Sequence, residues 1–210
     1  MASVFDNLRD RSGSDPETIR ALYDNWADDY DTTLAEWGYE AAAVVAAYLR
    51  DLVPADAFVL DAGCGTGLSG QALWEAGFRN ILGADFSAVS LALAAKRRVY
   101  RTVLKADLAA PLPLGAGALG GVACVGVLSY LPDVEAICRE FCRLTRPGGV
   151  IVLTQRSDLF GPRGTQAAFD ALASAGLWQP VEVTEARPYL PNNPEFEGVG
   201  VHYGVFRRSQ

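Results

Sequence analysis

The sequence predicts an α/β fold, a three-layer sandwich whose central sheet is mostly parallel and seven-stranded. Two observations support this prediction. From about residue 57 to residue 155, short apolar runs of strand type alternate with runs of helical type. The first apolar run leads into the glycine-rich segment 63–67, which is typical of a strand that turns sharply into a helix.

The expected elements follow in order along the chain. Apolar runs bounded by turn residues predict strands at residues 58–61, 81–85, 101–106, 121–125 and 150–155. Helices are expected at residues 68–77, 89–98 and 134–144, whereas the Ala-, Gly- and Pro-rich stretch 108–120 favours no long helix. The tail holds a helix at 164–174 and two β-runs at 181–187 and 200–208. Because no helix separates these two runs, they predict an antiparallel hairpin at the sheet edge.

The amino-terminal quarter predicts helices only. Asp15, Pro16 and Glu17 form a helix start, and the apolar residues that follow share one face: Ile19, Leu22, Tyr23 and Trp26. A second helical run spans residues 34–52 and ends before Pro54. We expect residues 1–14 to be loosely ordered. Residues 1–53 are expected to form a helical lid over a core of residues 54–210, within a single domain of residues 1–210.

The composition excludes several classes of protein. A net charge of −7 argues against capture of nucleic acid, and the basic run Lys96, Arg97, Arg98 and Arg101 is expected to be the solvated end of a helix. The four cysteines and the one histidine lack the spacing of zinc ligands, so no metal is expected. Free thiols fit a reducing compartment, and neither a secretory signal nor a membrane-spanning run is found. These features predict a cytoplasmic protein with no membrane partner.

The segment Val59-Leu60-Asp61-Ala62-Gly63-Cys64-Gly65-Thr66-Gly67 carries the functional prediction. Gly63 and Gly65 fit a dinucleotide loop, but Leu68 stands where its third glycine belongs, and no Walker-type Gly-Lys-Ser/Thr follows. With its flanks, the pattern D-x-G-x-G-x-G resembles motif I of the class I S-adenosylmethionine-dependent methyltransferases. The resemblance implies a Rossmann-like fold and the cofactor S-adenosylmethionine, with S-adenosylhomocysteine as product. The alternative is a glycine-rich turn in another α/β protein.

Residues just after each expected strand are informative, because ligands of open α/β sheets bind at the carboxyl ends of the strands. Asp85 lies 24 residues after Asp61, close to the spacing at which an acid binds ribose hydroxyls; the alternative is a cap on the helix near Ser87. Asp107 follows the third strand and could accept from the adenine amino group, or serve as a turn residue. Gly126 follows the fourth strand, where it leaves room for a methionine moiety.

Two further segments extend the resemblance. Leu144-Thr145-Arg146-Pro147-Gly148-Gly149 leads into an apolar strand, as the turn before the fifth strand does in this family. The pattern Y-D-x-W-A-x-x-Y-D, at Tyr23 to Asp31, resembles the lid helix of small-molecule methyltransferases, most closely the methyltransferase-like proteins of the Williams–Beuren syndrome region. In such enzymes Trp26 and Tyr30 would lie near the methionine end, where an aromatic ring favours a sulfonium. The alternative for these aromatics is an apolar core stripe.

The sequence departs from the family at Gly120-Gly121, where an acidic residue is frequent, and it lacks the N-P-P-Y/F signature of many methylases that act on exocyclic amines. Together with the acidic charge, that absence argues against methylation of DNA bases. The predicted function is methyl transfer to a small-molecule acceptor that the sequence does not identify. The alternatives are a cofactor-binding protein without its own catalysis and a nicotinamide-dependent dehydrogenase. Oligomeric state is not predicted.

The predicted site has three parts. The cofactor-binding residues are Trp26, Tyr30, Asp61, Gly63, Cys64, Gly65, Gly67, Leu68, Asp85, Phe86, Ser87, Asp107, Leu108, Val125 and Gly126. No catalytic residue is assigned, and the candidates for a general base are Tyr30, Tyr130 and His202. Residues 188–198, with Tyr189, Leu190 and Phe196, are expected to act as a substrate lid; the alternative is an exposed hairpin loop.

Overall fold

Within residues 16–26 and 29–210, which the computed structural model describes, an eight-stranded sheet forms the middle layer. The strand order is β3-β2-β1-β4-β5-β8-β6, and the short strand β7 pairs with β8. The strand bounds are β1 Phe58–Ala62, β2 Asn80–Asp85, β3 Thr102–Lys105, β4 Leu119–Cys124, β5 Thr145–Arg156, β6 Trp178–Val183, β7 Arg187–Pro188 and β8 Gly200–Arg208. The expected mostly parallel α/β sheet is confirmed, with β7 as one strand more than predicted.

Strands β1 to β5 run parallel to one another, and β8 runs antiparallel between β5 and β6. The expected antiparallel pair is therefore present, but its first strand starts at Trp178 and not at residue 181. Trp178 is buried and stacks on Phe206 with ring centroids 3.9 Å apart, which anchors the beginning of β6 in the core.

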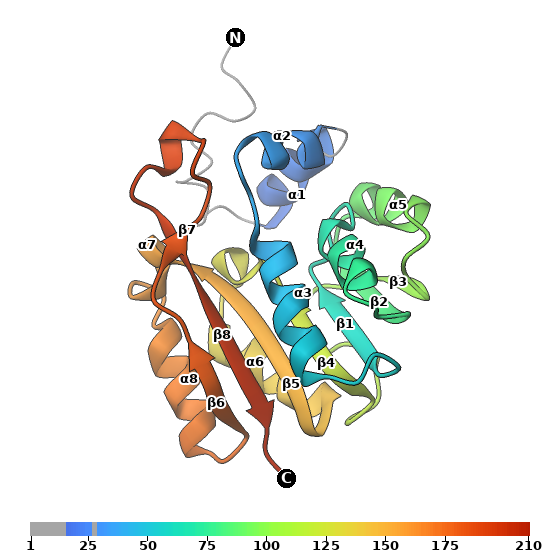
Figure 1. Ribbon diagram of the computed structural model, residues 1–210, viewed down its shortest axis with the longest axis vertical. Coiled ribbons are helices and arrows are strands. Elements are labelled where there is room, and N and C mark those ends of the chain that lie inside the picture. The colour runs from blue at the N-terminus through green and yellow to red at the C-terminus, as the bar shows by residue number, and fades with distance from the viewer. Residues whose placement is uncertain (1–15, 27–28) are drawn as a thin grey trace.

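Helices cover both faces of the sheet (Figure 1). The apolar residues of α3 (Ala41–Leu52) and α4 (Leu68–Glu75) pack on one face, and those of α6 (Val134–Leu144) and α8 (Thr165–Ser174) pack on the other. Helix α5 (Ala88–Lys96) lies beside β3. As expected, no helix occurs between β3 and β4, and the three-layer sandwich is confirmed.

The amino-terminal helices differ from the expectation in one respect. A single helix was expected over residues 34–52, but the structure has α2 (Tyr30–Glu36) and α3 on either side of Gly38. Gly38 has a φ of +75°, a left-handed conformation that ends the first helix, and a Cβ there would lie 2.9 Å from Pro191 Cγ. The break lets α3 pack on the sheet while α2 joins α1 (Pro16–Trp26) above it.

Helices α1 and α2 lie with the segment of residues 184–199 at one end of the molecule, where β1 and β5 terminate (Figure 1). One apolar cluster joins them: Leu22, Trp26, Leu34, Leu190, Phe196 and Val199. The short helix α7 (Ser157–Phe160) was not expected; it follows β5 directly. Residues 1–15, which include the expected cap Asp15, and the motif positions Ala27 and Asp28 lie outside the described residues. In the described part of the chain, we find no helix long and apolar enough to cross a membrane.

Candidate functional site

A cavity opens at the carboxyl ends of the parallel strands, beneath the lid helix α2. The empty space between its walls is about 1090 Å³, a value that includes space open to solvent. Its described lining consists of Tyr30, Gly63, Gly65, Thr66, Asp85, Phe86, Ser87, Ser90, Ala106, Asp107, Leu108, Ala109, Val125, Gly126, Val127, Tyr130, Leu131 and Pro132. Most of the residues that the sequence predicted to bind the cofactor are therefore brought together in one place.

The glycine loop presents bare backbone to this cavity. The backbone N–H groups of Gly63 and Cys64 both donate to the carbonyl oxygen of Ala84, at 2.8 and 3.0 Å, which fixes the loop against β2. Gly63 has a φ of +77°, and a Cβ at this position would lie 2.2 Å from Cγ2 of Val127. Only glycine fits there, so the loop lies directly against the segment that follows β4.

The carboxylate of Asp85 lies at the floor of the cavity and is 7% exposed. Its two oxygens accept from the backbone N–H groups of Gly65 and Ser87, both at 2.9 Å. Burial raises the pKa of Asp85, and the backbone donors oppose that rise. The helix cap is Ser87, whose side chain accepts from the N–H of Ser90. Each Asp85 oxygen has a second lone pair, so the pair of ribose hydroxyls fits here.

Asp107 and two apolar side chains form the other end of the cavity. One oxygen of Asp107 accepts from the N–H of Ala109 at 2.8 Å, so the expected turn role is present, and the second oxygen remains available to an amino group. Phe86 is half-buried and Leu108 is buried, and both line the cavity. Adenine is a flat base that binds against apolar surface and needs an acceptor for its amino group, so these residues fit the predicted cofactor.

Asp61 does not belong to the described cavity lining. It is fully buried in β1, where its carboxylate accepts from the hydroxyls of Ser69, at 2.8 Å, and Tyr100, at 2.7 Å. Burial raises the pKa of Asp61 to about 6 although both hydroxyls act in the opposite direction. The carboxylate therefore joins β1, α4 and the segment before β3, and direct contact of Asp61 with the cofactor stays a prediction.

Four other predicted residues also lie outside the described lining. Trp26 is buried in the lid, with its ring 4.7 Å from that of Tyr30 and 5.7 Å from that of Trp37. Leu68 packs against the same lid cluster, and the Cys64 side chain packs on α5. Gly67 caps the start of α4. Their side chains support the cavity wall, and direct contact of these residues with the cofactor stays a prediction.

Tyrosines from four segments converge beside Gly126, and we call Tyr30, Tyr39, Tyr130 and Tyr189 the tyrosine quartet. Tyr30 and Tyr130 line the cavity, and the Tyr39 hydroxyl lies 3.5 Å from where a Cβ on Gly126 would be. The rings of Tyr39 and Tyr189 meet edge to face at 5.9 Å. Burial raises the pKa of Tyr30, Tyr39 and Tyr189, so these hydroxyls stay protonated and can donate at neutral pH.

The structure does not bring His202 to the described lining of the cavity. His202 lies in β8, with its ring 4.3 Å from that of Phe160 and its Nδ1 2.8 Å from the carbonyl oxygen of Thr184. A carbonyl only accepts, so Nδ1 carries the proton and donates. This candidate base is therefore engaged in joining β8 to the segment after β6, while Tyr30 and Tyr130 remain at the cavity.

Sequence reasoning missed several residues that line or border the cavity. Five of them directly adjoin predicted residues in the chain: Thr66, Ala106, Ala109, Val127 and Leu131. The other two, Ser90 and Pro132, lie two or three positions from a predicted residue, so wider windows around each motif would have found most of them. Tyr39 was missed because the expected continuous helix hid the turn at Gly38. In the described residues, no cluster of His, Cys, Asp and Glu of the kind that holds a metal ion is found.

Comparison with known proteins identifies relatives of this chain. A family model for a methyltransferase domain matches residues 60–153. Human Methyltransferase-like protein 27 is 34% identical over 167 residues, which cover 75% of this chain and 67% of the human protein. A ubiquinone biosynthesis O-methyltransferase from Chromobacterium violaceum is 35% identical over 98 residues, covering 43% of this chain and 40% of that protein. An 18S rRNA (guanine-N(7))-methyltransferase from Arabidopsis thaliana is 35% identical over 101 residues, 48% of this chain and 34% of that protein.

Solved structures share the fold. A methyltransferase structure from Methanococcus maripaludis superposes with a TM-score of 0.66 and 13% identity, covering 91% of this chain and 94% of that one. A geranyl diphosphate C-methyltransferase from Streptomyces coelicolor, in complex with S-adenosyl-L-homocysteine, gives a TM-score of 0.61 and 17% identity, with 78% of each chain covered. Since the likeness to the human protein spans three quarters of this chain and the cavity fits the adenosyl group, the chain belongs to the class I S-adenosylmethionine-dependent methyltransferases, and S-adenosylmethionine is its cofactor.

Proposed function

We propose that this methyltransferase acts on a small-molecule acceptor, which it holds between the tyrosine quartet and the methyl group of the cofactor. The observation that carries the proposal is the convergence of Tyr30, Tyr39, Tyr130 and Tyr189 beside Gly126, where the cavity wall has no side chain. Aromatic faces and neutral hydroxyl donors together suit a small acceptor with apolar surface and a polar reacting atom.

Each part of the cavity has a task in this reaction. S-adenosylmethionine supplies a methyl group that a positively charged sulfur already activates. Asp85 holds the ribose, Asp107 holds the adenine, and the bare backbone at Gly63 and Gly65 permits close approach of the methionine moiety. The quartet orients the acceptor for in-line attack and excludes water, so the protein contributes mainly through positioning.

Closure over the cavity supports a small acceptor. The segment 188–198 meets α2 through Asn192, whose backbone N–H donates to the carbonyl oxygen of Trp37 and whose side chain donates to that of Glu36. Buried Leu190 and Phe196 then pack against the lid helices. A site beneath the lid helices, on a chain with a net charge of −7, suits a metabolite better than an RNA, which one relative of this chain methylates by its name.

A cytoplasmic location is part of the same proposal. Four cysteines, all of them buried and none in a disulfide, support residence in a reducing compartment. The residues 188–198 are proposed to act as a lid over the acceptor, because this segment packs on the lid helices and carries Tyr189.

The test is methyl transfer from radiolabelled S-adenosylmethionine, with a metabolite extract in one arm and total RNA in the other. We expect label in a small organic product and none in RNA. Tyr39→Phe should reduce turnover about tenfold or more while S-adenosylhomocysteine still binds, because one donor to the acceptor is lost. Tyr48→Phe is the matched control, since the Tyr48 hydroxyl bonds Glu182 away from the cavity.

Two results would contradict the proposal. Label that enters RNA and not the metabolites would assign a nucleic-acid acceptor. Binding of S-adenosylhomocysteine with no transfer in either arm would favour the alternative, a cofactor-binding protein without its own catalysis.

A further inference from the structure

The two aspartates of the motif Y-D-x-W-A-x-x-Y-D, Asp24 and Asp31, are not part of the described cavity lining, yet each bonds to a residue that lines it. Asp31 of α2 accepts from the hydroxyl of Thr66, in the glycine loop, at 2.7 Å. The other oxygen of Asp31 is bonded to Nη2 of Arg97, and Nε of Arg97 donates to the carbonyl oxygen of Thr66 at 2.7 Å. We call Asp31, Thr66 and Arg97 the lid clasp, because they tie the lid to the cofactor loop in a closed triangle.

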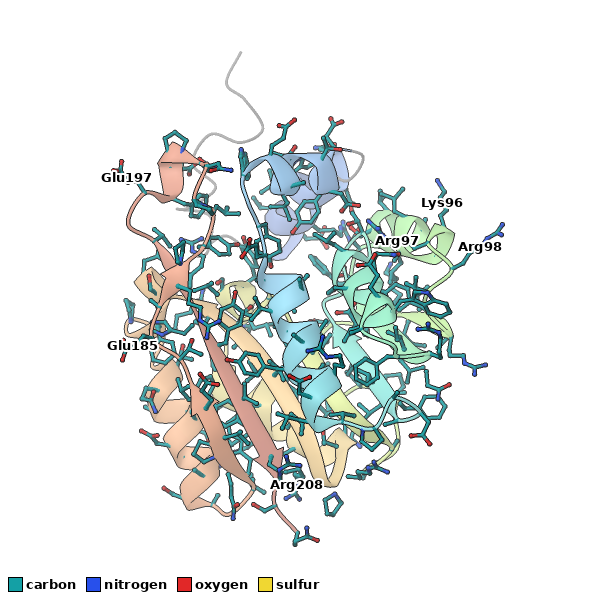
Figure 2. The ribbon with its side chains drawn as sticks, in the orientation of Figure 1. Lys96, Arg97, Arg98, Glu185, Glu197 and Arg208 are labelled. Carbon is teal, nitrogen blue, oxygen red and sulfur yellow. The ribbon has the colours of Figure 1, made fainter. Side chains whose placement is uncertain are left out.

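The side chain of Arg97 points toward Thr66 and Asp31. Figure 2 shows Arg97 turned inward toward the lid helices, whereas its neighbours Lys96 and Arg98 extend outward from the end of α5. Lys96 and Arg98 are exposed and Arg97 is not, although the three stand side by side in the sequence. The basic run that composition assigned to solvent therefore contains one residue with a specific partner.

A second tie connects α1 with the same cavity. Asp24 is bonded to the hydroxyl of Ser87, which lines the cavity and whose backbone N–H donates to Asp85. Gly65, the residue before Thr66, donates its N–H to the other oxygen of Asp85. Asp31 and Asp24 therefore contact the two segments whose backbone N–H groups donate to Asp85.

The contact with the cofactor loop and a part of the cavity wall come from adjacent residues of α2. Asp31 in the clasp is next to Tyr30, which forms the cavity wall, and α2 ends just before Tyr39. A ligand that orders residues 65–66 and Asp85 stabilises the partners of Asp31, and the seated helix in turn presents these tyrosines. Occupancy of the cofactor site and closure of the acceptor site then share one set of hydrogen bonds.

We propose that Asp31 is a positioning residue that couples cofactor occupancy to the seating of α2, so that the acceptor binds after the cofactor. The statement about the acceptor rests on the proposed function, whereas the coupling to the cofactor does not. The Asp31 and Arg97 side chains are 38% and 22% exposed, so salt screens their ion pair and weakens the clasp.

The experiment uses the full chain with S-adenosylhomocysteine and needs no acceptor. Hydrogen exchange of the backbone amides of Tyr30–Glu36 is followed with and without S-adenosylhomocysteine, and the dissociation rate of S-adenosylhomocysteine is measured by stopped flow. In the wild type we expect the ligand to slow exchange in α2. Asp31→Asn, which keeps one acceptor for Thr66, should speed dissociation several-fold, and Asp31→Ala on the order of tenfold or more. Both variants should lose most of the ligand-induced protection.

Matched controls isolate the clasp from general effects of charge. Asp29→Asn removes an exposed carboxylate at the N-cap position of α2, where the side chain makes no capping hydrogen bond. Arg98→Gln removes the charge of the outward-pointing neighbour of Arg97. Both should behave as the wild type, whereas Arg97→Gln should behave as Asp31→Asn. Added salt should speed dissociation in the wild type and have little effect in Asp31→Asn.

The proposal is overturned if Asp31→Asn and Arg97→Gln both retain the wild-type dissociation rate and the protection of α2. It is also overturned if Asp29→Asn and Arg98→Gln show the same changes as the clasp variants. Arg97→Gln leaves the lid sequence intact, so it decides the question if Asp31→Ala fails to fold. Absence of methyl transfer in the acceptor assay leaves these measurements unaffected, so failure of the proposed function and failure of this inference are distinguishable.

Discussion

The hydroxyl of Tyr100 donates to the carboxylate of Asp61 at 2.7 Å, deep beneath the glycine loop. Ser69 donates to the same carboxylate, so an acid that is fully buried is held by hydroxyls from two other segments. Gly70 and Gly83 both lie against the Tyr100 side chain: a Cβ would come within 2.1 Å of its hydroxyl oxygen at Gly70, and within 3.0 Å of its Cε1 at Gly83. The first motif of the cofactor site is thus supported from behind by a polar network.

Tyr100→Phe tests this support. The change leaves the buried carboxylate of Asp61 without one of its donors, so the free energy of unfolding at pH 7 should fall by about 1–3 kcal/mol. Urea unfolding monitored by circular dichroism measures it. Tyr48→Phe, whose hydroxyl bonds Glu182 at the surface, should cost much less, and an equal loss in both variants would count against the network.

Asp61 also predicts a dependence of stability on pH. Its pKa is about 6 in the folded protein against 3.8 in the unfolded chain, so the folded state binds the proton more tightly. The corresponding stability is therefore present below pH 4 and is lost as the pH rises through about 6, by on the order of 3 kcal/mol. Asp61→Asn cannot titrate, so the difference in unfolding free energy between wild type and variant should shift in the variant's favour from pH 4 to pH 7. Parallel profiles would refute this assignment.

Asp85→Ala should weaken binding of S-adenosylhomocysteine on the order of a hundredfold, because the acceptor for the ribose hydroxyls and the anchor of Gly65 are lost together. Asp107→Ala should have a smaller effect, since Asp107 is exposed. Isothermal titration calorimetry measures both, and a thermal melt confirms folding. Binding of NAD in place of S-adenosylhomocysteine would contradict the assignment of this site.

Gly63→Ala should destabilise the loop by about 1–3 kcal/mol and abolish most cofactor binding, because the new Cβ meets Val127 and the backbone stays in the left-handed region. Adding Val127→Ala should recover part of the stability, since it removes the clash and not the backbone strain. Gly115→Ala is the control: a Cβ there meets nothing within 4 Å. Thermal unfolding with and without S-adenosylhomocysteine separates the two effects.

Replacing residues 191–198 by a short Gly-Ser connection should reduce turnover of the acceptor far more than affinity for the cofactor. This segment contributes to the lid cluster, whereas the described cavity lining takes none of its residues. The rate at which the product identified in the metabolite assay forms is compared with the calorimetric affinity for S-adenosylhomocysteine, which separates the effect on the acceptor from the effect on the cofactor. Equal losses in both quantities would argue for a role in folding only.

Local patterns in the sequence predicted the alternating strands and helices from residue 57 to residue 155 and the identity of the cofactor loop. Both follow from local rules: apolar runs bounded by glycines form strands, and glycines mark where backbone must turn at Gly63 or approach a ligand. Asp85 was found by its spacing from Asp61, because the length of one strand-helix-strand unit is nearly constant in such folds.

Contacts between distant segments determine which polar groups face the cavity and which bond to one another. Asp61 and Asp85 both lie at the ends of parallel strands, yet Asp61 is fully buried among hydroxyl partners, whereas Asp85 lines the cavity. Arg97 and Arg98 are neighbours in sequence, yet one bonds Asp31 across the molecule and the other points to solvent. Such outcomes depend on contacts between residues far apart in the chain, which local patterns do not encode.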